Sequence, residues 1–231
     1  MGTSARPEWA VFDLVGTLLD PASLAPVLPE RVADREGLLT DALDDAVLAA
    51  MALTHVGAHR PFRDLLGAAV ARRAAAAGTP LDPPEVEEVL AAVAWMSPFP
   101  GAAGCLDRLA AAGIRVAVLT NSPTAAAERA LRTGRLLDRV SLVVGSDQVG
   151  AFKPDRRVYA HGLAALGARP PVAVMVAAHW WDLLGARAAG MRIAWVGHRE
   201  RVLTDLLPAP DWRGDDLAAV AAAIASGPDA R

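Results

Sequence analysis

The sequence has 231 residues, of which 53% are hydrophobic and 21% are charged, so it can bury a large core and is not a mostly disordered chain. Its net charge of −3 and the lack of any Lys/Arg run argue against a protein that binds nucleic acid through phosphate contacts. The single cysteine, Cys105, excludes a disulfide within the chain and a cysteine zinc site, and its place on an apolar helical face indicates packing.

We find no membrane or export signal in the sequence. No apolar run approaches the roughly 20 residues of a membrane span. The start of the chain, from Met1 to Glu8, lacks the apolar segment of a signal peptide. We therefore expect a cytoplasmic protein with no membrane partner.

The first predicted element is a short apolar run over residues 9–12, which is typical of a buried parallel strand and places Asp13 at its C-terminal end. Residues 21–98 are rich in Ala and Leu at helical spacing and are broken by prolines, which predicts a small all-helical insert. Within the insert, His55 and His59 lie four residues apart in a predicted helix. That spacing suits a metal pair, but no carboxylate motif accompanies it, which favours a surface or packing role.

From residue 99 the pattern alternates between strands and helices. Strands are predicted over residues 114–119, 141–144, 172–176 and 192–196, and helices over residues 101–112, 124–134 and 183–189. Lys153-Pro154 opens a further helix, and the segment from Pro208 is predicted as loop plus one amphipathic helix over residues 217–224.

Repeated strand–helix units predict an α/β protein with a parallel sheet covered on both faces, a Rossmann-like three-layer sandwich. We expect residues 1–20 and 99–231 to form this core domain and residues 21–98 to form the helical domain. Ligands of such sheets bind beyond the carboxyl ends of the strands. Asp13, Thr120, Asn121 and Asp182 fall at or just after such ends, so we expect them at one rim.

Asp13 has the surroundings of a nucleophile. A carboxylate at a strand end can attack a substrate carbon or phosphorus. Gly16 permits a tight turn behind it, and Thr17 can hydrogen-bond the carboxylate and orient it. Lys153 can supply the opposing charge that keeps Asp13 ionised. Lys153 is the only lysine of the sequence, and a compact ammonium is the feature that Arg cannot replace.

The remaining polar residues of the rim have more than one possible role. Thr120, Asn121 and Ser122 precede a predicted helix, where they can cap the helix and bind an anion. Asp182 can orient Lys153, activate water or bind a cation.

Four segments of the sequence resemble, in order and spacing, the four motifs of the haloacid dehalogenase superfamily. These segments are residues 12–20 (FDLVGTLLD), 119–122 (LTNS), 153–155 (KPD) and 176–190 (VAAHWWDLLGARAAG). The helical insert resembles the cap domain of that superfamily. The likeness is strongest to the type II L-2-haloacid dehalogenases, which need no metal and displace halide with the aspartate of the first motif to form an ester that water hydrolyses.

The resemblance implies a small organic acid as substrate, no cofactor and a possible homodimer. It assigns catalysis to four residues, namely Asp13 as nucleophile, Thr17, Lys153 and Asp182. It assigns substrate contacts to seven residues, namely Val15, Phe62, Thr120, Asn121, Tyr159, His179 and Trp181. Tyr159 is also suited to the core, since it lies inside a predicted helix.

The sequence departs from this family at three places. Val15 occupies a position that is usually aromatic in the dehalogenases, and this widens the pocket. The phosphatases of the superfamily have an acidic residue there that protonates the leaving alcohol, which Val15 cannot do. The dehalogenases also carry a halide-binding arginine early in the cap, whereas no arginine lies between Arg35 and Arg60 here. In the fourth motif, Ala177 and His179 replace Ser and Asn.

Three functions therefore compete. The first is (S)-2-haloacid dehalogenation through an aspartyl ester on Asp13. The second is phosphoryl transfer with Mg²⁺ held by Asp13 and Asp182, which Val15 predicts to be slow. The third is a protein of this fold with a divergent substrate or lost catalysis. His179 can line the pocket, act as a base for water or serve a structural role.

Overall fold

The computed structural model describes residues 6–227. Residues 1–5 and 228–231, which the predicted core domain includes, lie outside the described residues. The centre of the fold is a six-stranded sheet with the order β5-β4-β1-β6-β7-β8, in which every pair of neighbours is parallel. Its strands are β1 (Trp9–Phe12), β4 (Arg115–Thr120), β5 (Leu142–Gly145), β6 (Ala173–Ala177), β7 (Arg192–Val196) and β8 (Trp212–Gly214).

Both faces of the sheet are buried. Side chains of a strand alternate between the two faces, and in β1 Ala10 and Phe12 pack into one apolar cluster while Trp9 and Val11 pack into another. This explains why the strand reads as a continuous apolar run rather than an alternating one.

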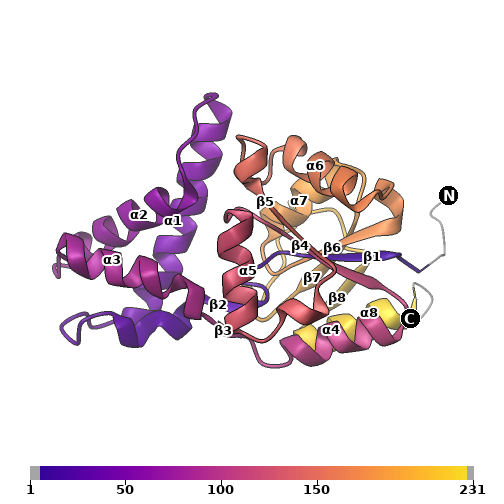
Figure 1. The fold of residues 1–231 in the computed structure, drawn as a ribbon, viewed down its shortest axis with the longest axis horizontal. Coiled ribbons are helices and arrows are strands. Elements are labelled where there is room, and N and C mark those ends of the chain that lie inside the picture. Colours follow the sequence, from indigo (N-terminus) through magenta and orange to yellow (C-terminus); the bar gives the residue numbers. More distant parts are fainter. Residues whose placement is uncertain (1–5, 228–231) are drawn as a thin grey trace.

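Helices cover the two faces to give three layers (Figure 1). The helices α4 (Ala102–Ala111), α5 (Thr124–Thr133) and α8 (Leu217–Ser226) contribute to the first cluster, and α6 (Arg156–Leu166) and α7 (Trp180–Ala188) contribute to the second. The predicted three-layer α/β fold is confirmed. The buried Cys105 belongs to the first cluster, and burial raises the pKa of its thiol to about 12.

The segment between β1 and α4 is helical and lies beside the sheet rather than on one of its faces (Figure 1). It contains α1 (Arg35–His55), α2 (Phe62–Ala76) and α3 (Pro83–Ala92), and the short antiparallel pair β2 (Leu19–Asp20) and β3 (Ser97–Pro98) connects it to the sheet. The helix boundaries follow the expected signals. Asp34 caps α1, Pro61 precedes α2, and Asp82 and Glu85 form a capping box at α3.

Two sequence predictions were wrong. The segment after Pro208 contains β8, a strand of only three residues on the sheet edge, whose pairing with β7 no periodicity could reveal. His55 and His59 do not share a helix, because α1 ends at His55, and His59 instead stacks on Phe152 with ring centroids 4.9 Å apart. Across residues 6–227, no helix is long and apolar enough to cross a membrane.

Candidate active site

Asp13 lies at the carboxyl end of the central strand because of the sheet register. Phe12 of β1 pairs with Val118 on one side and with Val176 on the other, so the residues that follow all three strands meet at one rim. Asp13 is 5% exposed. Thr17 donates from its Oγ1 to Asp13 Oδ2 at 2.9 Å and accepts a hydrogen bond from the amide of Ala178 at 3.0 Å, which fixes the carboxylate between two strand ends.

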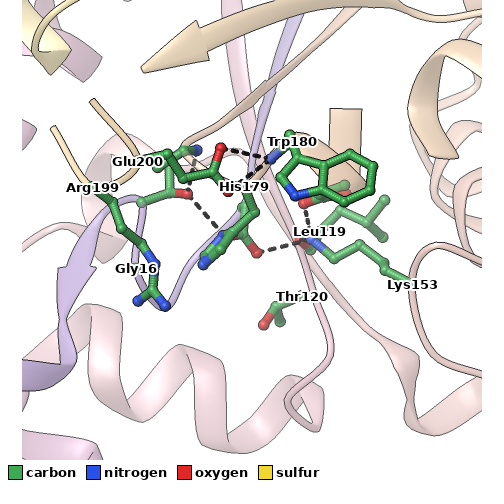
Figure 2. Close-up of polar contacts among 12 residues, drawn as sticks. Gly16, Leu119, Thr120, Lys153, His179, Trp180, Arg199 and Glu200 are labelled. Carbon is green, nitrogen blue, oxygen red and sulfur yellow. Dashed lines mark hydrogen bonds and ion pairs between the residues drawn. The ribbon is translucent and has the colours of Figure 1, made fainter. Parts of the chain in front are cut away.

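The ammonium of Lys153 is fully buried and has three oxygen partners. It contacts Asp13 Oδ1 at 2.9 Å, Asp182 Oδ2 at 2.6 Å and the carbonyl oxygen of Leu119 at 2.8 Å (Figure 2). An ammonium has three protons to donate, and here each has an acceptor. The prediction that the only lysine faces Asp13 therefore holds in the structure.

Asp182 lies behind Lys153 and is also fully buried. Tyr159 donates from its hydroxyl to Asp182 Oδ1 at 2.7 Å, while the other carboxylate oxygen faces Lys153. Asp182 thus holds the ammonium in place and is held in turn by the phenol. The sequence suggested Tyr159 as a substrate contact, but its fully buried side chain contacts Asp182 and does not line the cavity beside Asp13.

His179 approaches Asp13 from the side opposite Lys153. Its Nδ1 lies 3.2 Å from Asp13 Oδ2, and the residue is 4% exposed. Its Nε2 is buried and has no hydrogen-bond partner among the described residues. The ring packs against the turn at Gly16, as Figure 2 shows, and lies 5.2 Å from the ring of Trp181.

A small cavity of about 20 Å³ opens beside Asp13. Most of the predicted substrate contacts line it, together with residues of α1 that sequence reasoning missed. Its walls are Asp13, Val15, Leu43, Val47, Phe62, Thr120, Asn121, Ser122, His179 and Trp181. Trp180 packs on the second apolar cluster, so one of the two adjacent tryptophans lines the cavity and the other packs on the core.

The polar residues after β4 combine structural bonds with a place in the cavity wall. Asn121 accepts a hydrogen bond from the amide of Lys153 at 2.8 Å, and Thr120 accepts one from the amide of Ser122 at 3.2 Å. The amide nitrogen of Asn121 and the hydroxyl of Ser122 therefore remain as donors beside the cavity.

No arginine of the insert reaches the cavity among the described residues. Arg35 donates to the carbonyl oxygen of Leu28, and Arg60 is exposed. Arg199, in the loop after β7, is the arginine that sequence reasoning missed. Figure 2 shows its guanidinium beside Gly16 and His179, and it forms an ion pair with Asp44 of α1. No motif marks Arg199, so only the folded chain reveals its position.

The ionisable groups of the site differ in the direction of their pKa shifts. Burial raises the pKa of Asp13, but the charge of Lys153 and the hydrogen bond with His179 lower it more, so the pKa lies well below its usual value. Burial lowers the pKa of Lys153, but Asp13 and Asp182 raise it more. Burial raises the pKa of Asp182 above its ordinary value despite Lys153. Asp13 is therefore the ionised carboxylate that faces the cavity.

The arrangement does not fit Mg²⁺ between Asp13 and Asp182. Lys153 donates to one oxygen of each carboxylate, Thr17 donates to the second oxygen of Asp13, and Tyr159 donates to that of Asp182. A cation between them would have to share both carboxylates with the buried ammonium. Within residues 6–227, no group of three or more His, Cys, Asp or Glu side chains is placed to hold a metal.

Known proteins match this chain in sequence. The family model of haloacid dehalogenase-like hydrolases matches residues 8–190. An (S)-2-haloacid dehalogenase of Pseudomonas sp. (strain CBS-3) is 36% identical over 95 residues, which are 41% of this chain and 42% of that enzyme. A phosphoglycolate phosphatase of Caulobacter vibrioides is 35% identical over 189 residues, which are 78% of this chain and 75% of that enzyme.

Solved structures show the same fold. The L-2-haloacid dehalogenase of Xanthobacter autotrophicus, with chloropropionic acid covalently bound, superimposes with a TM-score of 0.85 at 22% identity and covers 94% of this chain and 97% of its own. The chain spans about half the length of the first curated relatives it matches in sequence.

Proposed function

The chain belongs to the haloacid dehalogenase-like hydrolases, and we propose that it cleaves the carbon–halogen bond of an (S)-2-haloacid with Asp13 as nucleophile. The observation that carries this proposal is the pairing of an ionised Asp13 with Val15. Asp13 is held by Lys153 and faces the cavity. Val15, which lines the same cavity, cannot protonate a leaving group. A halide leaves without a proton, whereas an alcohol needs one.

In the first step, an oxygen of Asp13 attacks C2 of the substrate and the carbon–halogen bond breaks, so the halide departs with the bonding electrons. The product is an ester between Asp13 and C2 with inverted configuration. The donors of Asn121 and Ser122 are suited to the substrate carboxylate or the departing halide. Lys153 keeps Asp13 ionised until it attacks.

In the second step, water attacks the carboxyl carbon of the ester and the bond from that carbon to the oxygen on C2 breaks. The oxygen on C2 takes up one proton as the 2-hydroxy acid leaves, the other proton goes to solvent, and the Asp13 carboxylate is regenerated. One proton of the water must be accepted by a base. Both oxygens of Asp182 are engaged by Lys153 and Tyr159. We therefore assign the proton to His179, whose Nδ1 lies 3.2 Å from Asp13 Oδ2 and whose Nε2 has no other hydrogen-bond partner among the described residues and can accept it. His179 then gives a proton to the oxygen on C2 as the 2-hydroxy acid leaves.

The direct test is bromide release from (S)-2-bromopropanoate in the presence of EDTA. The wild type is expected to release bromide, and Asp13→Asn to release none. Asp205→Asn is the matched control, because Asp205 is exposed and lies outside the site. Bromide release by Asp13→Asn at the wild-type rate would show that Asp13 is not the nucleophile. Loss of bromide release in EDTA would show that the reaction needs a metal ion.

Phosphoester hydrolysis is the second candidate, and the 35% identity to a phosphatase over 75% of its length favours it. Val15 and the engaged carboxylate oxygens oppose it. Phosphate release from phosphoglycolate with Mg²⁺ at a higher kcat/KM than bromide release would favour this candidate. If folded protein releases neither bromide nor phosphate and forms no covalent adduct on Asp13, a divergent substrate or lost catalysis is favoured.

We further propose that residues 21–98 act as a cap domain over a core of residues 1–20 and 99–231, since α1 and α2 contribute Leu43, Val47 and Phe62 to the cavity. Homodimer formation and a cytoplasmic location remain proposals that rest on family resemblance. Light scattering in solution tests the first, with twice the 24.0 kDa monomer mass as the expected result.

A further inference from the structure

A second and much larger cavity, of about 320 Å³, lies between the helical insert and α5. Its wall is almost wholly apolar and includes Leu24, Leu66, Val70, Leu90, Met96 and Ala126. The polar exceptions are Ser122 and the exposed Arg63 and Arg129. A largely apolar, partly open cavity of this size is suited to a hydrophobic ligand and not to the polar groups of a small haloacid.

The large cavity adjoins the cavity beside Asp13. Four residues line both, namely Val15, Leu43, Phe62 and Ser122. Val15 therefore stands where the two cavities meet, and its side chain is small for that place. The cavity beside Asp13, at about 20 Å³, has room for little more than the reacting carbon and its immediate substituents.

We propose that the large cavity binds an apolar substituent on C2 of the substrate, such as an alkyl chain of medium length or an aryl group. The inference rests on the proposed function, because it needs C2 beside Asp13 and the carboxylate near Asn121 and Ser122. From that position, the direction past Val15 leads into the large cavity. The enzyme would then prefer long-chain or aryl 2-haloacids to 2-halopropanoates.

The first test compares kcat/KM for (S)-2-bromopropanoate, (S)-2-bromohexanoate and (S)-2-bromooctanoate. Burial of a methylene is worth about four-fold in binding, so kcat/KM is expected to rise by about that factor for each methylene that enters the cavity. A value that stays level or falls from propanoate to octanoate would overturn the inference.

The second test fills the large cavity without touching the cavity beside Asp13. Ala126 of α5 lines only the large cavity of the two, so Ala126→Phe is expected to lower kcat/KM for bromooctanoate at least ten-fold and to change that for bromopropanoate less than two-fold. Ala160→Phe is the matched control, because Ala160 is exposed on α6. Equal effects of Ala126→Phe on both substrates would contradict the inference.

A binding measurement separates this inference from the proposed reaction. Calorimetric titration with 2-hydroxyoctanoate and lactate uses product-like acids that need no turnover. Tighter binding of 2-hydroxyoctanoate that Ala126→Phe abolishes supports the apolar subsite even if no halide is released, in which case the proposed reaction alone is wrong. Equal affinity for the two acids, with halide released from bromopropanoate, supports the reaction and overturns the subsite.

Discussion

At the scale of single residues, the chemistry depends on an ammonium that satisfies three acceptors at once. Lys153 donates to the carboxylates of Asp13 and Asp182 in the interior of the protein, and the carbonyl oxygen of Leu119 accepts its third hydrogen bond. A guanidinium is larger, planar and has five donors in a fixed fork, so it cannot replace this geometry. The composition bias toward arginine makes the retention of one lysine at this place informative.

We predict that Lys153→Arg lowers kcat/KM at least about 100-fold, the order of a lost charge-stabilising donor. Lys153→Met leaves two buried carboxylates unpaired and is expected to cost about 3–5 kcal/mol of unfolding free energy. Halide release and urea denaturation measure the two effects. Wild-type activity in Lys153→Arg would show that only the charge matters.

The same residue sets the pH dependence. Lys153 holds the pKa of Asp13 below its usual value, so removal of Lys153 raises that pKa. The acid limb of kcat/KM, which reports loss of the Asp13 carboxylate, is therefore expected at higher pH in Lys153→Met than in the wild type. A pH profile of the residual activity checks the direction, and an unchanged limb would contradict it.

His179 is expected to act after the halide has left. His179→Ala should release one equivalent of bromide in a burst and then turn over about 100-fold more slowly, because the ester forms but its hydrolysis lacks a base. Rapid-quench measurement of bromide, with mass spectrometry of the trapped protein, tests this order. Loss of the burst together with the steady-state rate would place His179 in the first step instead.

Sequence could predict Asp13, Thr17 and Lys153 because each lies in a motif whose chemistry restricts the residue type. It could not predict that Tyr159 binds Asp182 rather than substrate, because a tyrosine in a helix fits core and site equally. Arg199 lies in a loop with no pattern, and its contact with Asp44 depends on how the helical insert sits against the sheet.

At the scale of elements, the turn after β1 places the histidine against the nucleophile. Gly16 has a φ of +87°, a region that L side chains rarely adopt, and a Cβ there would lie 2.6 Å from the ring of His179. The turn thus needs glycine for its backbone and for the space that the ring occupies.

Gly16→Ala is expected to cost about 1–2 kcal/mol for the backbone conformation alone and to push the ring of His179 away from Asp13. Gly113→Ala is the matched control, since Gly113 has a φ of +77° but no atom within 4 Å of its Cβ position. We predict at least as much thermal destabilisation in Gly16→Ala as in Gly113→Ala, but loss of halide release only in Gly16→Ala. Equal activity in the two would show that the ring position is unimportant.

The strands of the sheet centre could be predicted because burial on both faces leaves continuous apolar runs, as in residues 9–12 and 173–177. The edge strand β8 could not, since three residues paired on one side carry no such pattern. The helix expected through His59 failed because α1 stops at His55, where the chain turns toward α2.

At the scale of the molecule, one ion pair connects the helical insert to the sheet beside the site. Arg199 follows β7 and pairs with Asp44 of α1, the helix that also supplies Leu43 and Val47 to the cavity. The side chain of Asp44 is more than half exposed, so the ion pair contributes little to the free energy of unfolding. We expect it instead to hold α1 in position over the cavity.

We predict that Arg199→Met changes the unfolding free energy by less than about 1 kcal/mol. Its KM for (S)-2-bromopropanoate is expected to rise several-fold, with kcat less affected, because α1 is held less closely over the cavity. Asp44→Asn should raise KM by the same factor, and the variant that carries both substitutions should show no further rise in KM. Independent, multiplying effects of the two substitutions would contradict a shared role.

The central claim, an ester on Asp13 that water opens at its carboxyl carbon, has one most direct test. A single turnover with enzyme in excess over (S)-2-bromopropanoate is run in heavy-oxygen water, and the peptide that contains Asp13 is examined by mass spectrometry. We expect the heavy oxygen in the Asp13 carboxylate and ordinary oxygen in the 2-hydroxy acid. Heavy oxygen in the hydroxy acid and none in Asp13 would mean that water attacks C2 directly, and the covalent account would be wrong.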